Sequence, residues 1–252
     1  MIQADFCPRI VVTRPEPGAS ATERVLRERG FDVLKRPLTQ LVPVSVDSDL
    51  RQAFFTVDYI IITSANAIRH APGGFLQAVR TVPVLAVGEA TAQQARDLGM
   101  ADVTSVNGDA DSVADEAPRL FKNGARIGYF CGKLRRDTVE TALSAHGFDV
   151  VIAETYKTEK VSQITDKFRS DLLTFFPDAA SIFSGVSAQI LSDTIAEPDI
   201  RQAFENKPVF AISDRAAKGL TEGWPGPVLI AERMEAGAMH DLIENYFFGC
   251  AS

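Results

Sequence analysis

The sequence "GFDV" occurs twice in this chain of 252 residues, in "RERGFDVLKRPLT" (residues 27–39) and in "SAHGFDVVIAETYKT" (residues 144–158). The two copies lie 117 positions apart, and residues 9–40 align with residues 126–157 at this spacing without a gap. Eight of the 32 aligned positions are identical, whereas average composition would give roughly two. The alignment therefore indicates an internal duplication.

Each copy has the order strand, loop, helix, strand. "RIVVT" and "RIGYF" are apolar runs typical of buried strands, and "ATERVLRER" and "TVETALSAH" have helical spacing. Gly30 and Gly147 stand where a helix ends in the left-handed conformation, which glycine adopts most easily. We interpret "GFDV" as a helix stop followed by the start of a buried strand, with no catalytic role.

The similarity continues beyond these segments. Residues 58–67 parallel 179–188, residues 83–99 parallel 208–223, and late strands follow near 102–106 and at 227–232. The long period indicates a duplicated domain rather than a solenoid. Alternating strands and helices predict parallel sheets with helices on both faces, with about five strands in each half.

Composition narrows the class of protein. The formal charge of −7 argues against a general nucleic-acid binder or an anionic-membrane binder. Cys7, Cys131 and Cys250 are scattered and odd in number, which is typical of reduced thiols in the cytoplasm. We expect no signal peptide and no membrane span, and we expect a monomer.

The motifs of common cofactors are missing from the sequence. It contains no G-x-G-x-x-G after a strand, no phosphate-binding G-x-x-x-x-G-K-[ST] and no G-x-S-x-G elbow. His70, His146 and His240 have no second histidine or cysteine at metal-ligand spacing. We therefore expect no cofactor and no metal, and a site made of turns.

Four turns follow apolar strands and precede predicted helices: "TRPEPG" from Thr13, "TSANA" from Thr63, "VGEATA" from Val87 and "SGVSA" from Ser184. Their hydroxyls are natural helix N-caps, which is the ordinary interpretation of each turn alone. The same turns offer N–H groups and hydroxyls to an anion. Two similar lobes would form a cleft, and four such turns facing it favour an anion site.

Basic residues adjoin some of these turns. Arg14 follows the first strand directly, and Lys133, Arg135 and Arg136 follow a later one in "CGKLRRD". Positive charge at a helix N-terminus opposes the helix dipole. That cost makes an anionic partner more plausible at "KLRR".

An ordered set of motifs resembles the uroporphyrinogen-III synthase family over nearly the whole chain. The motifs are "TRP", "TSANA", "AVGEATA", "CGKLRRD", "GFDVVIAETYKT" and "FSGVSA". The chain departs from the family pattern at Ala216, which stands where Thr91 stands in the first copy, and at "CG" (131–132), a position often written Arg-Gly.

The resemblance implies an α/β fold of two flavodoxin-like lobes that exchange segments and are joined by a two-stranded linker. One lobe would comprise residues 1–36 and 158–252, the other residues 40–154, with linkers near 36–40 and 154–158. Such a hinge would let the lobes open and close.

The resemblance also implies a reaction: hydroxymethylbilane closes to uroporphyrinogen III, with loss of water and inversion of ring D, in haem biosynthesis. The partner would be this linear tetrapyrrole, with room for transient contact with hydroxymethylbilane synthase. Tyr156 is the candidate proton donor. The candidate substrate-binding residues are Arg14, Ser64, Asn66, Thr91, Cys131, Gly132, Arg135, Ser184, Ser187 and Ser213.

Two other functions stay open at this point. A hinged binding protein could close on an anionic small molecule without catalysis, although such proteins usually carry a secretory signal. A flavodoxin-like protein would bind a flavin and purify as a yellow solution.

Overall fold

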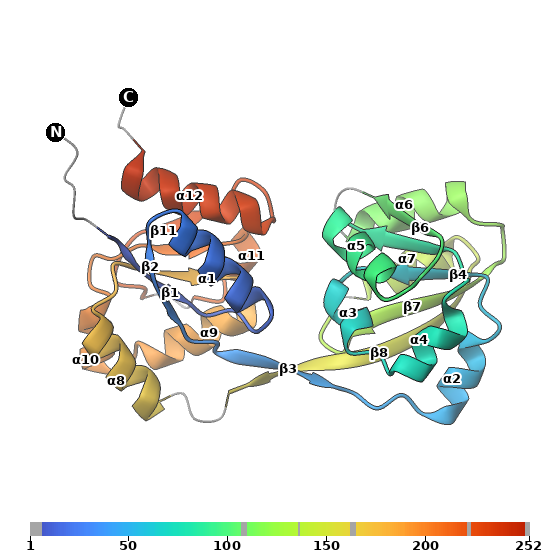
Figure 1. Cartoon of the computed structure of the whole chain (residues 1–252), viewed down its shortest axis with the longest axis horizontal. Helices are drawn as coiled ribbons and strands as arrows, with labels where there is room; N and C mark the ends of the chain where they lie inside the picture. Colours follow the sequence, from blue (N-terminus) through green and yellow to red (C-terminus); the bar gives the residue numbers. More distant parts are fainter. Residues whose placement is uncertain (1–6, 107–109, 136, 162–164, 221–222, 250–252) are drawn as a thin grey trace. The chain divides into compact units, whose positions relative to one another are not determined.

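The computed structural model describes residues 7–106, 110–135, 137–161, 165–220 and 223–249. Arg136 and Cys250 lie outside the described residues. The chain divides into two compact units, unit 1 (Met1–Gln40 with Glu159–Ser252) and unit 2 (Leu41–Thr158). Figure 1 shows the elements of each unit.

Unit 1 contains a five-stranded sheet in the order β11-β10-β9-β1-β2, and every neighbouring pair is parallel. Its strands are β1 (Arg9–Val12), β2 (Asp32–Lys35), β9 (Ala179–Ile182), β10 (Val209–Ala211) and β11 (Val228–Ile230). Its helices are α1 (Gly18–Glu28), α8 (Thr165–Phe175), α9 (Gly185–Thr194), α10 (Pro198–Ala203), α11 (Asp214–Ala217) and α12 (Ala236–Phe248). Because β1 pairs with β9, segments far apart in sequence form the centre of this sheet.

Unit 2 contains a six-stranded sheet in the order β3-β8-β7-β4-β5-β6. Its strands are β3 (Thr39–Pro43), β4 (Tyr59–Ile62), β5 (Val84–Val87), β6 (Val103–Val106), β7 (Arg126–Gly132) and β8 (Asp149–Lys160). Its helices are α2 (Ser48–Phe54), α3 (Ala65–Arg69), α4 (Gly73–Val79), α5 (Glu89–Asp97), α6 (Ala110–Leu120) and α7 (Thr138–Ala145). The chain enters this unit within β3 and leaves it within β8.

The sheet of unit 2 is buried on both faces. Ile60 and Ile62 of β4 pack into one hydrophobic cluster and Ile61 packs into another, and all three are fully buried. Successive side chains of a strand point to opposite faces, so the run "YIII" requires apolar cover on both sides. None of the helices in the described part of the chain is long and apolar enough to cross a membrane.

The predicted α/β fold with two mainly parallel sheets is confirmed. The two glycines of the repeated "GFDV" also behave as predicted, since Gly30 has φ 89° and Gly147 has φ 83°, each directly after the C-cap residue of its helix, α1 or α7. Each amide donates back to a carbonyl of the preceding helix turn, Gly30 to Arg27 and Gly147 to Ser144. Both copies therefore use the same helix stop.

Candidate functional site

Three polar side chains follow neighbouring strands of unit 1 at the same distance from the strand end. Arg14, Ser184 and Ser213 each lie two residues beyond the last residue of β1, β9 and β10. These strands are adjacent and parallel, so their carboxyl ends meet at one edge of the sheet. Ligands of open α/β sheets bind at this edge.

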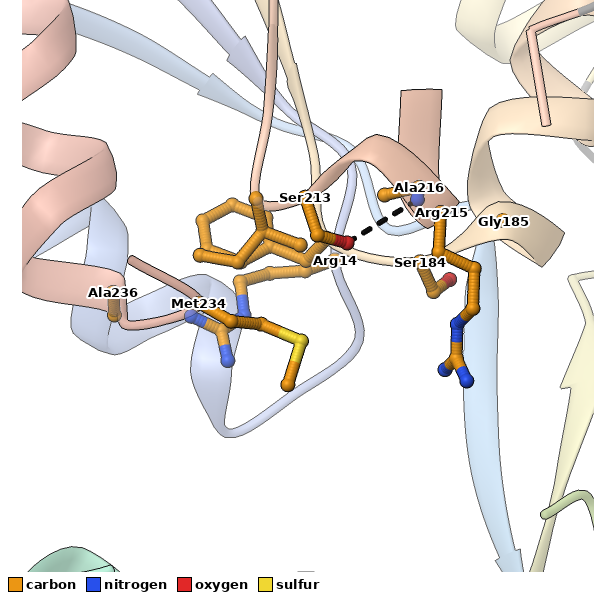
Figure 2. A pocket seen from close by; sticks show the side chains of 10 residues that line it. Arg14, Ser184, Gly185, Ser213, Arg215, Ala216, Met234 and Ala236 are labelled. Atoms are coloured by element: carbon orange, nitrogen blue, oxygen red, sulfur yellow. Dashed lines mark hydrogen bonds between the residues drawn. The ribbon is translucent and has the colours of Figure 1, made fainter. Parts of the chain in front are cut away.

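A pocket of about 220 Å³ lies at that edge. The side chains of Arg14 and Arg215 line it, and the first turns of α9, α11 and α12 contribute Gly185, Ala216 and Ala236. Figure 2 shows the two arginines and these turns around the pocket. Helix N-termini carry free N–H groups and partial positive charge, so the pocket suits an anion.

Neutral groups surround Arg14. Its Cζ lies 4.1 Å from the ring centroid of Phe183, and its Nη1 donates to Thr22 Oγ1 at 3.3 Å. A Cβ on Gly18 would stand 2.4 Å from Arg14 Nε, so only glycine leaves room for the guanidinium there. Burial lowers the pKa of Arg14, and no carboxylate of the described residues forms an ion pair with it. Its positive charge is therefore available to a ligand.

Ser64 and Ser184 are helix caps, as the sequence predicted, and Ser213 is a third. Ser184 Oγ accepts from the amide of Ser187 at 3.1 Å, and Ser213 Oγ accepts from the amide of Ala216 at 3.3 Å. Ser64 Oγ accepts from the amide of Asn66 in unit 2 at 3.3 Å. A serine hydroxyl keeps a proton and a second lone pair when it caps, so capping does not exclude ligand binding. Ser184 donates that proton to Ser187 Oγ at 3.0 Å.

Unit 2 brings Tyr156, Gly132 and Ser64 together. A Cβ on Gly132 would stand 2.6 Å from Tyr156 Cζ, so the phenol ring lies against the bare backbone of this glycine. Burial has the larger effect on the pKa of Tyr156 and raises it, whereas the hydroxyl of Ser64 acts to lower it. The ring of His70 lies 5.6 Å from the Tyr156 ring, centroid to centroid. Tyr156 thus stays protonated well above neutral pH.

Arg135 lies between two carboxylates of its own chain. Its Nε pairs with Glu140 at 2.5 Å and its Nη1 with Glu154 at 2.7 Å. Nη1 also donates to the carbonyl of Gly132 at 3.2 Å. Burial opposes its charge, but the bonds to Glu154 and Glu140 outweigh burial and raise the pKa of Arg135. Unlike Arg14, this arginine already has anionic partners.

The remaining candidates differ in access. Cys131 is 1% exposed, burial raises its pKa to about 12, and its thiol points to the carbonyl of Ala153. Ser187 and Thr91 are buried too, in the first turns of α9 and α5. Asn66 Oδ1 accepts from Arg69 at 2.8 Å. A contact of Cys131, Ser187 or Thr91 with a ligand would need their backbone or a rearrangement, whereas Asn66 is half-buried.

Sequence reasoning missed the residues that support the site. Thr22 and Phe183 hold Arg14, while Glu140 and Glu154 hold Arg135. One signal was present, because Gly18 follows Arg14 by one helical turn in "RPEPG". No group of three or more His, Cys, Asp or Glu side chains in the described segments is placed to hold a metal ion.

Fold and sites together define an internally repeated, two-unit α/β protein with polar turns at the carboxyl ends of its strands. A model of the family described as uroporphyrinogen-III synthase HemD matches residues 20–241. The chain therefore belongs to the uroporphyrinogen-III synthase family, as its motifs predicted.

Solved structures support the fold. The chain is 18% identical to the uroporphyrinogen-III synthetase of Helicobacter pylori, with a TM-score of 0.62 over 95% of this chain and 99% of that one. It is also 18% identical to a mutant uroporphyrinogen III synthase of Thermus thermophilus, with a TM-score of 0.55 over 95% of this chain and 97% of that one. No curated protein matches the chain.

Proposed function

We propose that the chain is a cyclising lyase, a uroporphyrinogen-III synthase that closes hydroxymethylbilane with inversion of ring D and loss of water. The observation that carries this function is the family match over residues 20–241. The function belongs to haem biosynthesis.

The pocket of unit 1 is proposed to bind carboxylates of the substrate. Hydroxymethylbilane carries acetate and propionate groups, whereas the chain itself has a net charge of −7. A local cation is therefore needed, and Arg14 supplies one that no described carboxylate offsets. Ser184 and Ser213 border the same pocket. The Ser213 hydroxyl and the helix N-termini offer further donors, whereas the Ser184 hydroxyl already donates to Ser187 Oγ.

Tyr156 is proposed to donate a hydrogen bond or proton to the departing hydroxyl. Its raised pKa keeps the phenol protonated, as a donor requires. Ser64 orients the hydroxyl and Gly132 leaves space for the ring. Glu154 and Glu140 occupy Arg135, so we assign Arg135 to fixing the carbonyl of Gly132.

The chemistry needs few catalytic groups. A pyrrole nitrogen lone pair expels the neighbouring hydroxyl, so the substrate supplies its own electronic push. Without an enzyme the linear tetrapyrrole cyclises with no inversion of ring D. The protein must instead hold a flexible molecule so that the substituted carbon of ring D attacks and forms a spiro intermediate. Such positioning contributes roughly 7–11 kcal/mol in favourable cases.

The test supplies freshly made hydroxymethylbilane, oxidises the products and separates type I from type III porphyrins. We expect type III to exceed the spontaneous background. A product ratio equal to that without protein would reject the enzyme and leave the two-unit binding protein. A yellow purified protein with flavin absorbance would favour a flavodoxin-like function instead.

We also propose a cellular location, an oligomeric state and a partner. The scattered cysteines favour the cytoplasm, and we propose a monomer. A transient contact with hydroxymethylbilane synthase would shorten the time that an unstable substrate spends in solution.

A further inference from the structure

A buried polar pair lies behind Arg14 in unit 1. Thr22 on α1 is 1% exposed, and His240 on α12 is 6% exposed. Thr22 Oγ1 lies 3.3 Å from Arg14 Nη1 and 3.4 Å from His240 Nε2. The buried Thr22 hydroxyl thus links the Arg14 guanidinium to the His240 imidazole. Arg14 and His240 lie near opposite ends of the sequence.

The chemistry of the three groups fixes the direction of the first hydrogen bond and allows one consistent direction for the second. A guanidinium has donors only, so Arg14 donates to the Thr22 oxygen. The hydroxyl then has its own proton to give, and the unprotonated Nε2 of a neutral His240 can accept it. Burial lowers the pKa of His240 to about 4, with Arg29 and Arg14 adding to the effect and Asp241 opposing it. His240 is therefore neutral at pH 7.

Arg29, unlike Arg14, is held by ion pairs. It follows α1 directly and pairs with two carboxylates of α12, Asp241 at 2.8 Å and Glu244 at 2.7 Å. Its charge is offset within the protein. Arg14 contacts a ring, a hydroxyl and the backbone of a glycine. The carboxylates of α12 thus neutralise the charge of Arg29, whereas α1 and α12 support Arg14 through neutral groups.

We propose that Thr22 and His240 are positioning residues: they hold the Arg14 guanidinium by neutral contacts and so leave its charge for a substrate carboxylate. The inference rests on the proposed role of Arg14 in binding. The second copy of the repeat lacks this arrangement. At the spacing of 117 residues, Cys131 stands in place of Arg14 and Val139 in place of Thr22.

A pair of substitutions tests the proposal. Thr22→Val removes the hydroxyl at nearly constant volume, and Thr22→Ser keeps it. We expect Thr22→Val to raise KM for hydroxymethylbilane about 3- to 10-fold, the effect of one lost hydrogen bond, with kcat within about 2-fold. Thr22→Ser should restore the KM of the wild type. An unchanged KM in Thr22→Val would overturn the proposal.

A double-mutant cycle separates positioning from general stability. If Thr22 acts through Arg14, Thr22→Val has no further effect on KM in an Arg14→Met background. An equal rise in both backgrounds would mean that Thr22 acts independently, and the proposal would fall. Melting temperatures of all four proteins serve as the control for folding.

A spectroscopic measurement tests the hydrogen bonds without any activity. The ¹⁵N shifts of the His240 imidazole at pH 7 should show a neutral ring with its proton on Nδ1. A proton on Nε2, or an imidazolium, would overturn the proposal even in an active enzyme. If the wild type forms no excess of type III porphyrin, the proposed function fails, while the imidazole shifts still decide the direction of the hydrogen bonds.

Discussion

Tyr156 and Gly132 touch so closely that any side chain at position 132 would displace the phenol. A Cβ there would stand 2.6 Å from Cζ and 2.9 Å from the hydroxyl oxygen of Tyr156. The two residues sit on neighbouring parallel strands, β8 and β7, and are partners in their register at an irregularity between Cys131 and Gly132. The sheet itself therefore places the phenol against the glycine.

Gly132→Ala should lower kcat by about 10-fold or more, because small misplacements of a reacting group are costly. Assay of type III product measures the effect. Gly73→Ala is the matched control, since a Cβ at that helical position meets nothing within 4 Å. Wild-type kcat in Gly132→Ala would show that the position of the phenol is unimportant.

Tyr156→Phe should slow turnover by at most about 100-fold, the low end of what a general acid contributes. Activity should stay above the spontaneous background, because positioning supplies most of the rate. Single-turnover kinetics with hydroxymethylbilane measure this. Complete loss of activity in a folded variant would count against a mainly positional mechanism.

Two substitutions at Ser64 separate its role as a cap from its proposed role in orienting the Tyr156 hydroxyl. Ser64→Ala loses both, whereas glycine is accepted at N-caps and costs only a few tenths of a kcal/mol. We expect both variants to slow turnover, and only Ser64→Ala to lose about 0.5–2 kcal/mol of stability. Urea unfolding and kcat give the two readouts. If turnover falls only where stability falls, Ser64 is a cap alone.

The stability of the fold should decrease as pH falls from about 6.5 to 4 because of His240. Its folded-state pKa is about 4, below the unperturbed value of 6.5, so in this window the unfolded chain binds a proton that the folded chain does not. This difference in proton binding lowers the free energy of unfolding by about 2 kcal/mol at pH 5 relative to pH 7. The groups whose charges act on the ring are Arg14, Arg29 and Asp241.

Urea unfolding of the wild type and of His240→Gln at pH 7 and pH 5 checks this prediction. Glutamine does not titrate, so the wild type should lose about 2 kcal/mol more than the variant on acidification. Equal losses, or a larger loss in the variant, would mean that His240 is charged in the folded protein.

Local features followed well from the sequence. The apolar run "YIII" predicted a strand, and the turns after β4 and β9 predicted the serine caps that the structure contains there. Arg135 shows where this reasoning stopped. Its position in "KLRR" predicted a cation that binds an anionic ligand, but Glu154 on the neighbouring strand β8 already pairs with it. Sequence distance alone does not reveal such a partner.

The sequence by itself determined the order of strands, turns and helices, because each depends on residues near one another in the chain. It also determined the duplication and the family, because both are read from the order of residues along the chain. Only the tertiary structure decided which arginine keeps its charge free. Thr22 and His240 stand 218 positions apart, and they meet because α1 and α12 pack together in unit 1. Packing brings distant residues into contact, and whether a buried cation meets a hydroxyl or a carboxylate depends on those contacts.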